Sequence, residues 1–582
     1  MKKSLIKKKL SFTPNLQNYE QTYRKFSWQD IEKELTYFKP GYLNAAYNAI
    51  DVPAQDARKN KVALYWEGAD GKVKKYTFAE ISSLSNKFAN VLKKLKVEKG
   101  QRVFIFLPRV PELYISFLGI LKTGAIAGTL FAAFGYQALK DRLENSDACI
   151  LITNKELKER VNKIKKNLPA LKKIIVIDQD SAKQNSSIIS FWQEMKKADD
   201  EFKVSQTKAE DPAFMLYTSG TTGKPKGVVH HHKAILHEYM TAKHVLDIKP
   251  EDVYWCTADP GWVTGIAYEI LGTWANAAST LVYEGRFSPD TWYSLIEKYR
   301  VNVWYTAPTA IRMLAAVGLK KVKKYDLSSL RFLASVGEPL NPEAVFWGQK
   351  AFGLPFHDNF WQTETGGIVI ANYPSMPIKP GSMGKPVPGI VAGIVDNKGK
   401  ELKPGKEGNL ALRPGWPSMM AKIWRRPKKY KSYFIGSPKK KDSWYITGDK
   451  AYKDKDGYFW FVGRADDVIK TAGERVGPFE VESALVEHPA VVEAGVIGKP
   501  DPMRGEIIKA FVVLAQSRED KESLIKQIQQ FVKKTLAGHA YPKEIEFVEK
   551  LPKTRSGKIV RRFLKAKELG LPIGDTSTLE EY

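Results

Sequence analysis

The segment MLYTSGTTGKPKGVV, residues 215–229, concentrates side chains that can bind an anion. Its apolar start is typical of a buried strand that ends near Thr218. The glycines that follow let the backbone approach a ligand closely, and successive backbone N–H groups in such a turn form an anion-binding hollow. Hydroxyl groups and the lysines at 224 and 226 add donors and positive charge. The pattern predicts a loop that binds a polyphosphate.

This loop differs from the Walker A phosphate loop. That motif needs glycine, four residues, and then Gly-Lys followed by Ser or Thr. Here Pro225 follows Lys224, and Thr218 stands where the first glycine is required. Ordinary turns also use glycine and threonine, so the loop alone leaves a simple surface turn open as an alternative.

Six further stretches follow in order along the chain. They are SVGEPLN from Ser335, DNFWQTETGG from Asp358, YITGD from Tyr445, GRADD from Gly463, GERVGPFEVESAL from Gly473 and PKTRSGK from Pro552. Together with YTSGTTGKPKG they resemble the motifs of the adenylate-forming enzymes, the superfamily of acyl-CoA synthetases, luciferases and peptide-synthetase adenylation domains. The AMP-forming acetyl-CoA synthetases are the most similar group. The resemblance covers nearly the whole chain.

The resemblance implies a reaction in two steps. ATP activates acetate as an acetyl-adenylate and releases pyrophosphate, and coenzyme A then displaces AMP. Lys558 would bridge the carboxylate and the α-phosphate, where a cation about 4 Å from an anion contributes roughly 4 kcal/mol at an effective dielectric of 20. Thr363 and Arg475 would contact phosphate oxygens. These three form the predicted catalytic set.

The same resemblance implies where ATP and magnesium bind. Phe360 would stack on adenine, and Asp449 would accept hydrogen bonds from the ribose. Mg²⁺ would bind Glu364, because oxygen ligands suit this hard cation. A second metal contact would use His488 with the backbone of Val486 and Val491. The full predicted ATP set is Thr218, Ser219, Gly220, Thr221, Thr222, Gly223, Lys224, Gly337, Glu338, Pro339, Asp358, Asn359, Phe360, Trp361, Gln362, Thr363, Asp449, Arg464 and Arg475.

Trp361 indicates the size of the acid. In family members that act on long or aromatic acids, the corresponding motif resembles YGxTE and has glycine at this position. Glycine leaves a tunnel there, which an indole would fill. Val263, Thr264 and Val336 would form the remaining wall. A hydrophobic site discriminates one methylene by only about 1–3 kcal/mol, but steric exclusion adds a repulsive contribution. The predicted substrate is acetate, and the alternative is a propionyl-CoA or other short-chain acyl-CoA synthetase. The simplest alternative for Trp361 itself is an ordinary core tryptophan without a role in substrate choice.

Coenzyme A and a change in domain arrangement are also implied. The C-terminal domain would swing about Asp466 between the two steps, and Gly473 would line the tunnel for pantetheine beside Thr264. Lys533 and Arg160 are candidates for the 3′-phosphate. The stretch FAAFG from Phe131 departs from the glycine-rich form of many relatives in this family. Lys558 is in addition a candidate for control by a lysine acetyltransferase and a deacetylase, since acylation removes its charge.

These motifs need a scaffold, and the sequence predicts an α/β fold. Apolar runs such as RVFIFLP, CILIT and KIIVID read as buried strands, and a helix with a capping box begins at Thr77 and Glu80. Such alternation favours parallel and mixed sheets covered by helices. We expect a large N-terminal domain at residues 1–463, a hinge at 464–467, and a small mobile α+β domain at 468–582 that carries the catalytic lysine.

Composition excludes some classes of protein. The 582 residues contain two cysteines, so a disulfide scaffold is not expected. No run of eighteen apolar residues occurs, and the basic N-terminus MKKSLIKKKLSF is not followed by an apolar region, so the prediction is a cytoplasmic protein without a membrane span.

The net charge of +28 has two interpretations. Dispersed lysines without interleaved aromatic residues favour a solvated surface over nucleic-acid binding, and we expect no specific nucleic-acid partner. DNA binding that persists at physiological ionic strength, with a steep salt dependence, would instead indicate a nucleic-acid-binding protein. A carrier-dependent adenylation domain is a further alternative, disfavoured because no carrier segment follows. The triplet His230–His232 is read as packing, since adjacent histidines do not converge easily on one ion.

Overall fold

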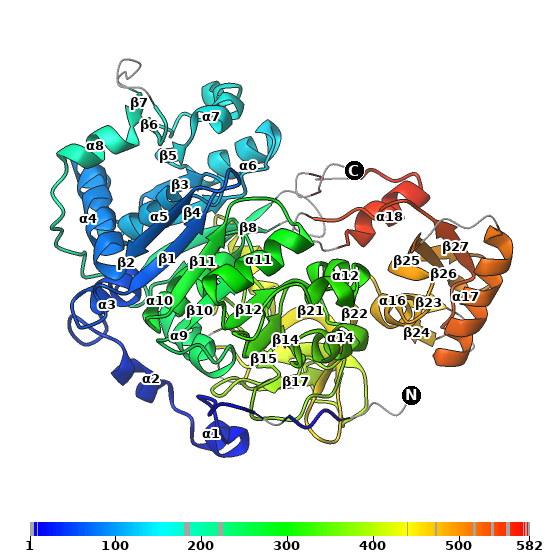
Figure 1. Cartoon of the computed structure of the whole chain (residues 1–582). Helices are drawn as coiled ribbons and strands as arrows, with labels where there is room; N and C mark the ends of the chain where they lie inside the picture. Colours follow the sequence, from blue (N-terminus) through cyan, green and yellow to red (C-terminus); the bar gives the residue numbers. More distant parts are fainter. Residues whose placement is uncertain are drawn as a thin grey trace.

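The structure is a computed structural model that describes residues 5–8, 10–179, 187–218, 225–438, 440, 442–471, 474–515, 520–536, 540–554, 559–573, 576 and 579; the side chain of Arg475 is not described. Among these residues the chain forms two large sheets, a smaller third sheet, and a separate C-terminal unit (Figure 1). No helix in the described ranges is long and apolar enough to cross a membrane.

The first large sheet has nine strands in the order β16-β15-β14-β13-β12-β10-β11-β1-β2. Its six central strands are parallel, and antiparallel strands close both edges. The strands are β1 (Val62–Glu67), β2 (Val73–Thr77), β10 (Val253–Cys256), β11 (Ser279–Tyr283), β12 (Val303–Thr306), β13 (Phe332–Ser335), β14 (Phe356–Phe360), β15 (Ile370–Ala371) and β16 (Lys385–Pro386).

The second large sheet has eight strands in the order β19-β9-β8-β4-β3-β5-β6-β7. The six strands from β8 to β7 are parallel, as their continuous apolar character predicts, and β9 pairs antiparallel with both β8 and β19. The strands are β3 (Arg102–Phe106), β4 (Ile126–Leu130), β5 (Ile150–Thr153), β6 (Lys173–Val176), β7 (Ile188–Ser190), β8 (Pro212–Thr218), β9 (Lys226–His231) and β19 (Lys422–Ile423).

Helices fill the space between and outside the two sheets. Helix α4 begins at the predicted capping box, because Thr77 accepts from the Glu80 backbone while the Glu80 carboxylate accepts from the Thr77 backbone. One core cluster joins residues of both sheets with α4, α5 and α9. The helices of this part are α1 (Tyr19–Lys25), α2 (Trp28–Glu34), α3 (Val52–Ala54), α4 (Phe78–Lys94), α5 (Pro111–Thr123), α6 (Tyr136–Ser146), α7 (Lys155–Asn162), α8 (Phe191–Lys197), α9 (Ala234–His244), α10 (Gly272–Ala275), α11 (Pro289–Tyr299), α12 (Pro308–Ala316), α13 (Leu319–Val322), α14 (Pro342–Phe352) and α15 (Pro427–Lys431), with π-helices at Tyr47–Asp51 and Gly265–Leu271 and a 3-10 helix at Lys165–Asn167.

A third, five-stranded sheet leads to the C-terminal unit. Its strands are β17 (Ala392–Val395), β18 (Gly408–Leu412), β20 (Phe434–Ile435), β21 (Trp444–Lys453) and β22 (Phe459–Arg464). The C-terminal unit, orange to red in Figure 1, packs three helices on its own five-stranded sheet around a separate core. It contains β23 (Ile469–Thr471), β24 (Glu474–Val476), β25 (Val491–Asp501), β26 (Gly505–Leu514), β27 (Glu544–Phe547), α16 (Pro478–Val486), α17 (Lys521–Thr535) and α18 (Arg561–Glu568). The predicted fold class is confirmed.

The basic N-terminus folds back on the large domain as a strap, which we define as residues 5–8 and 10–16. Ile6 exchanges two backbone hydrogen bonds with Ile378, at 2.9 and 3.0 Å. The Lys8 ammonium lies 2.8 Å from Nε2 of His357 and also donates to the Tyr373 carbonyl. His357 belongs to β14, the strand that leads into the DNFWQTETGG motif. Residues 5–8 of the basic N-terminal segment are therefore part of the fold.

Candidate active site

The motif residues gather where parallel strands end. Strand β13 ends at Ser335 and is followed by Val336–Pro339, and its neighbour β14 ends at Phe360 and is followed by Trp361–Gly367. Strand β8 of the second sheet ends at Thr218, where the predicted phosphate loop begins. The carboxyl ends of strands in open α/β sheets are the usual place for ligands. Gly337 takes φ +94°, a conformation that favours glycine and turns this loop.

Hydrogen bonds fix the strand ends to one another. The buried Asp358 accepts from the backbone N–H groups of Leu340 and Asn359, at 3.3 and 3.0 Å, and so links β14 to the loop after β13. Burial raises the pKa of Asp358 well above its ordinary value. Asn359 accepts from the Tyr305 hydroxyl at 2.8 Å and donates to the Ser335 carbonyl at 2.9 Å. Both residues belong to the predicted ATP set, and both also connect β14 to its neighbours in the sheet.

The Trp361 indole is wedged between two tyrosines. Its ring meets Tyr268 edge to face, with centroids 5.0 Å apart and planes at 88°, and its Nε1–H donates to the Tyr305 hydroxyl at 3.3 Å. Val263 and Val336 are buried in the core cluster against which Trp361 packs. Thr264 stands half-buried at the N-terminal end of the π-helix. These contacts orient the half-buried indole.

A polar network joins the next motif residues. Gln362 donates to the Thr447 carbonyl at 2.9 Å and to Oδ2 of Asp449 at 2.8 Å. The Arg464 guanidinium reaches Oδ1 of the same carboxylate at 2.9 Å. The Tyr445 hydroxyl donates to Oε1 of Gln362 at 2.9 Å. Residues from three distant motifs are thereby brought together, and their role in binding a nucleotide stays a prediction.

The buried Glu364 has partners that the sequence argument missed. The Lys226 ammonium lies 2.7 Å from Oε1 of Glu364, and the Tyr433 hydroxyl donates to the same oxygen at 3.3 Å. Burial alone raises the pKa of Glu364, but Lys226 and Tyr433 outweigh it and hold the pKa below its ordinary value. From the sequence, Lys226 is predicted only to add positive charge to the phosphate loop. No spacing rule connects it with Tyr433, which lies 207 positions later.

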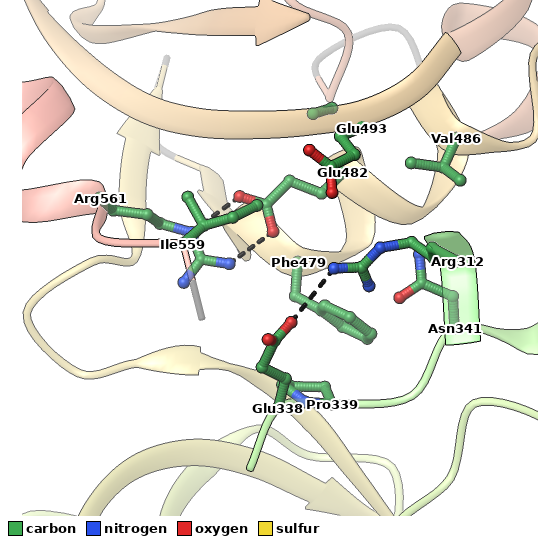
Figure 2. A pocket seen from close by; sticks show the side chains of 11 residues that line it. Arg312, Glu338, Pro339, Asn341, Phe479, Glu482, Val486, Glu493, Ile559 and Arg561 are labelled. Carbon is green, nitrogen blue, oxygen red and sulfur yellow. Dashed lines mark hydrogen bonds and ion pairs between the residues drawn. The ribbon is translucent and has the colours of Figure 1, made fainter. Parts of the chain in front are cut away.

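A small cavity of about 50 Å³ lies between the large domain and the C-terminal unit (Figure 2). Glu338 and Pro339 of the predicted ATP set line it from one side, and Ile559 and Arg561 from the other. Arg312 pairs with Glu338 at 3.3 Å. The guanidinium of Arg561 makes two hydrogen bonds to the Glu482 carboxylate, at 2.7 and 2.5 Å. The C-terminal unit thus approaches the predicted nucleotide site.

The turn that contains Asp466 connects two sheets. Strand β22 belongs to the third sheet and β23 to the C-terminal sheet, and the exposed Asp466 lies in the turn between them. In β24, the backbone of Arg475 is paired with Lys470. Thr363 is half-buried, in the turn that follows Phe360.

Two of the candidates for coenzyme A, Lys533 and Arg160, lie on helices α17 and α7. Lys533 is exposed on α17 with its ammonium 5.6 Å from the Tyr541 ring centre. Arg160 on α7 donates to the carbonyls of Ala132 and Phe134, at 2.9 and 3.1 Å, and so supports the FAAFG stretch.

The second predicted metal contact occupies one turn. Val486 ends α16, the His488 carbonyl accepts from the Val491 N–H at 2.9 Å, and Nδ1 of His488 accepts from the Ala490 N–H at 3.2 Å. A group of three or more acidic, histidine or cysteine side chains able to hold a metal ion is absent from the described residues.

The His230–His232 triplet lies in and just after β9. Nδ1 of His230 lies 3.0 Å from the Ser418 carbonyl, and Nδ1 of His232 accepts from the Ala45 N–H at 3.1 Å. Burial lowers the pKa of both rings, to about 4 and about 3. Both histidines are fully buried packing residues. Ser219–Lys224, Gly473 and Lys558 lie outside the described residues, so their predicted roles stay predictions.

Comparison with known proteins extends the assignment over the chain. A family model described as AMP-binding enzyme matches residues 53–424, and one described as AMP-binding enzyme C-terminal domain matches residues 480–558. An acetyl-coenzyme A synthetase of Bacillus subtilis is 56% identical over 568 residues, which cover 97% of this chain and 98% of that protein. One of Methanothrix thermoacetophila is 44% identical over 93% of this chain and 86% of that protein.

Solved structures agree with the fold. An anthranilate CoA ligase in complex with anthranoyl-AMP has a TM-score of 0.84 and 32% identity, covering 94% of this chain and 99% of that chain. An acyl-CoA synthetase of Brucella canis has a TM-score of 0.74 and 34% identity, covering 95% and 99%. Since these matches span nearly the whole length and the motif residues meet at the strand ends, the chain belongs to the AMP-binding enzyme family.

Proposed function

We propose that this protein is an AMP-forming acetate–CoA ligase, which activates acetate with ATP and transfers the acetyl group to coenzyme A. The observation that carries the acid's identity is the fixed Trp361 indole, held between Tyr268 and Tyr305. An indole that cannot rotate away excludes long acids sterically. The names of the relatives support the same acid.

In the first step, residues of this chain would bind the ribose and the α-phosphate of the nucleotide. Asp449, oriented by Gln362 and Arg464, is placed to accept from ribose hydroxyls. Lys558 would bring the carboxylate and the α-phosphate together. Ile559, the next residue, lines a cavity with Glu338 and Pro339, which supports this assignment. Cations and donors set in place before the reaction stabilise the developing charge without reorganisation.

Magnesium is the metal that this site would take with ATP. Glu364 supplies a buried carboxylate beside the strand that follows the phosphate loop. Mg²⁺ in nucleotide sites uses one or two carboxylates together with phosphate oxygens, so the donor set fits. When bound, the cation would neutralise charge on the triphosphate.

In the second step coenzyme A would attack the acyl-adenylate after the C-terminal unit has turned about Asp466. The exposed turn between β22 and β23 is a suitable pivot, because hinges are usually a few residues at the ends of elements. Residues 1–463 and 468–582 would then move as two domains. Gly473, Thr264, Lys533 and Arg160 are proposed for coenzyme A on the resemblance.

The test is AMP release with ATP, magnesium and coenzyme A across acetate, propionate, butyrate and octanoate, for the parent, Trp361→Phe and Trp361→Gly. We expect the parent to prefer acetate and to use propionate poorly. The preference should shift to longer acids in the order of the space vacated, least for phenylalanine and most for glycine. A parent that already prefers octanoate would refute the acyl-pocket assignment, and a parent that prefers propionate would favour the short-chain alternative. Failure of every acid to release AMP would refute the proposed reaction.

A further inference from the structure

The hydroxyl group of Tyr433 touches both members of the Lys226–Glu364 ion pair. It donates to Oε1 of Glu364 at 3.3 Å and accepts from the Lys226 ammonium. The same ammonium lies 4.8 Å from the centre of the Tyr433 ring. The side chains of Lys226 and Glu364 are 13% and 11% exposed, so water gives them little stabilisation and the few protein partners dominate their placement.

Tyr433 is itself held on several sides. Its carbonyl accepts from the Ile446 N–H at 2.8 Å, and its N–H donates to the Tyr430 carbonyl at 3.2 Å. Its ring stacks on Tyr445, with centroids 5.9 Å apart and planes at 19°. Tyr445 in turn donates to Gln362, which orients Asp449. The hydroxyl is therefore presented from a rigid support that also reaches the proposed ribose contact.

We propose that Tyr433 is a positioning residue that keeps Lys226 and Glu364 in place for a metal-bound triphosphate. The inference rests on the proposed function, in which Glu364 receives the cation. In the structure the Glu364 carboxylate is paired with Lys226, so binding of the cation requires that both residues exchange partners. The cation takes the carboxylate, and the lysine turns to a phosphate oxygen.

The phenol suits this exchange because it has one donor and an acceptor oxygen. It keeps a hydrogen bond to the carboxylate when the lysine leaves, and it offers an oxygen to the lysine when the carboxylate turns to the metal. Neither buried charge is left without a partner on the way, which matters because an unpaired buried charge is far more costly than a neutral polar group. A phenylalanine ring would keep the stacking and lose only this function.

The experiment compares direct binding of two ligands to Tyr433→Phe by calorimetry. One is the magnesium complex of α,β-methylene ATP, and the other is AMP without metal. We expect the affinity for the magnesium complex to fall about tenfold, as for the loss of one hydrogen bond to a charged group, and the affinity for AMP to change less than twofold. In steady state the KM for magnesium–ATP should rise much more than kcat falls.

Tyr430→Phe is the matched control. Tyr430 lies three positions earlier on α15 and packs its ring on Phe434 at 5.2 Å. It should bind both ligands as the parent does. Equal binding of the magnesium complex by Tyr433→Phe and the parent would overturn the proposal, and so would an equal loss of AMP affinity, which indicates a general structural defect. Since both ligands are bound without turnover, these outcomes differ from a failure of the acetate assay, which concerns the proposed function itself.

Discussion

At the scale of single residues, hydrogen-bond partners decide which groups are available to a ligand. Asn359 uses its carbonyl on Tyr305 and one amide N–H on Ser335, so one amide N–H is left for the edge of a base. Gln362 is engaged at both ends, and under the proposed function it would act on the nucleotide through Asp449. We therefore propose that the motif residues divide into those that would contact the ligand and those that orient them.

Asp449→Asn tests this division. The amide that replaces one carboxylate oxygen is a donor and faces donors of Gln362 or Arg464, so both orientation and ribose binding suffer. The loss of a charge-assisted hydrogen bond costs about 1.5–3 kcal/mol, and we expect the KM for ATP to rise at least about tenfold.

The control is Asp454→Asn in the same hairpin. Asp454 pairs with Lys379 away from the site. It should lower the thermal midpoint without changing the KM for ATP. Parallel increases of KM in both variants would mean that Asp449 acts only through stability.

At the scale of elements, rules that depend on neighbouring residues predicted helix starts and strands correctly. The capping box at Thr77 and Glu80 and the strand runs RVFIF and AFMLYT formed as expected, because neighbours along the chain and burial decide them. The partners Tyr433 of Lys226 and His357 of Lys8 lie hundreds of positions away. No periodicity encodes such a pair. The resemblance supplied the motif residues of the site but not the side chains that support them.

The strap gives a pH prediction. Burial lowers the pKa of Lys8 to about 7, whereas a lysine in an unfolded chain keeps about 10.4. Nδ1 of His357 donates to the Leu333 carbonyl at 2.9 Å, so Nε2 accepts from Lys8, and the Tyr373 carbonyl is its other partner. Between pH 7 and 10 the unfolded state binds more protons, and stability from this group therefore rises with pH.

We expect the free energy of unfolding of the parent, relative to Lys8→Met, to rise from pH 7 to pH 9.5 and to be level below pH 7. Urea titrations at each pH measure it. Lys7→Met, at the exposed neighbouring position, should show no such slope. A parent-to-variant difference that stays constant up to pH 9.5 would contradict the burial of Lys8.

At the scale of the whole molecule, one turn carries the connection between two separately packed bodies. The C-terminal unit has its own core and meets the large domain around the cavity lined by Glu338 and Arg561. At this cavity the ion pair Arg312–Glu338 lies within the large domain and Arg561–Glu482 within the C-terminal unit, while the charges of Arg561 and Glu338 attract each other across the cavity. The bodies can therefore separate without breaking either pair, which suits a rotation between two half-reactions.

Lys558→Gln, which imitates acylation, tests whether the two half-reactions use different arrangements of the C-terminal unit. We expect AMP formation from acetate and ATP to be lost, while acetyl-CoA still forms from supplied acetyl-adenylate, because the lysine's charge serves only the first step. Rapid-quench assays of each half-reaction measure both. Full acetate-dependent activity in the variant would refute the catalytic role and, with it, control by an acetyltransferase and a deacetylase.

The pairing of Ile6 with Ile378 also sets an order of events during synthesis. The ribosome releases residue 6 first, yet its partner Ile378 does not emerge until roughly 20–70 seconds later at about 5–20 residues per second. The N-terminus must wait, unpaired and basic, while most of the large domain takes shape beside it. Residues 5–8, though made early, thus find this partner only after β14 and most of its sheet have been synthesised.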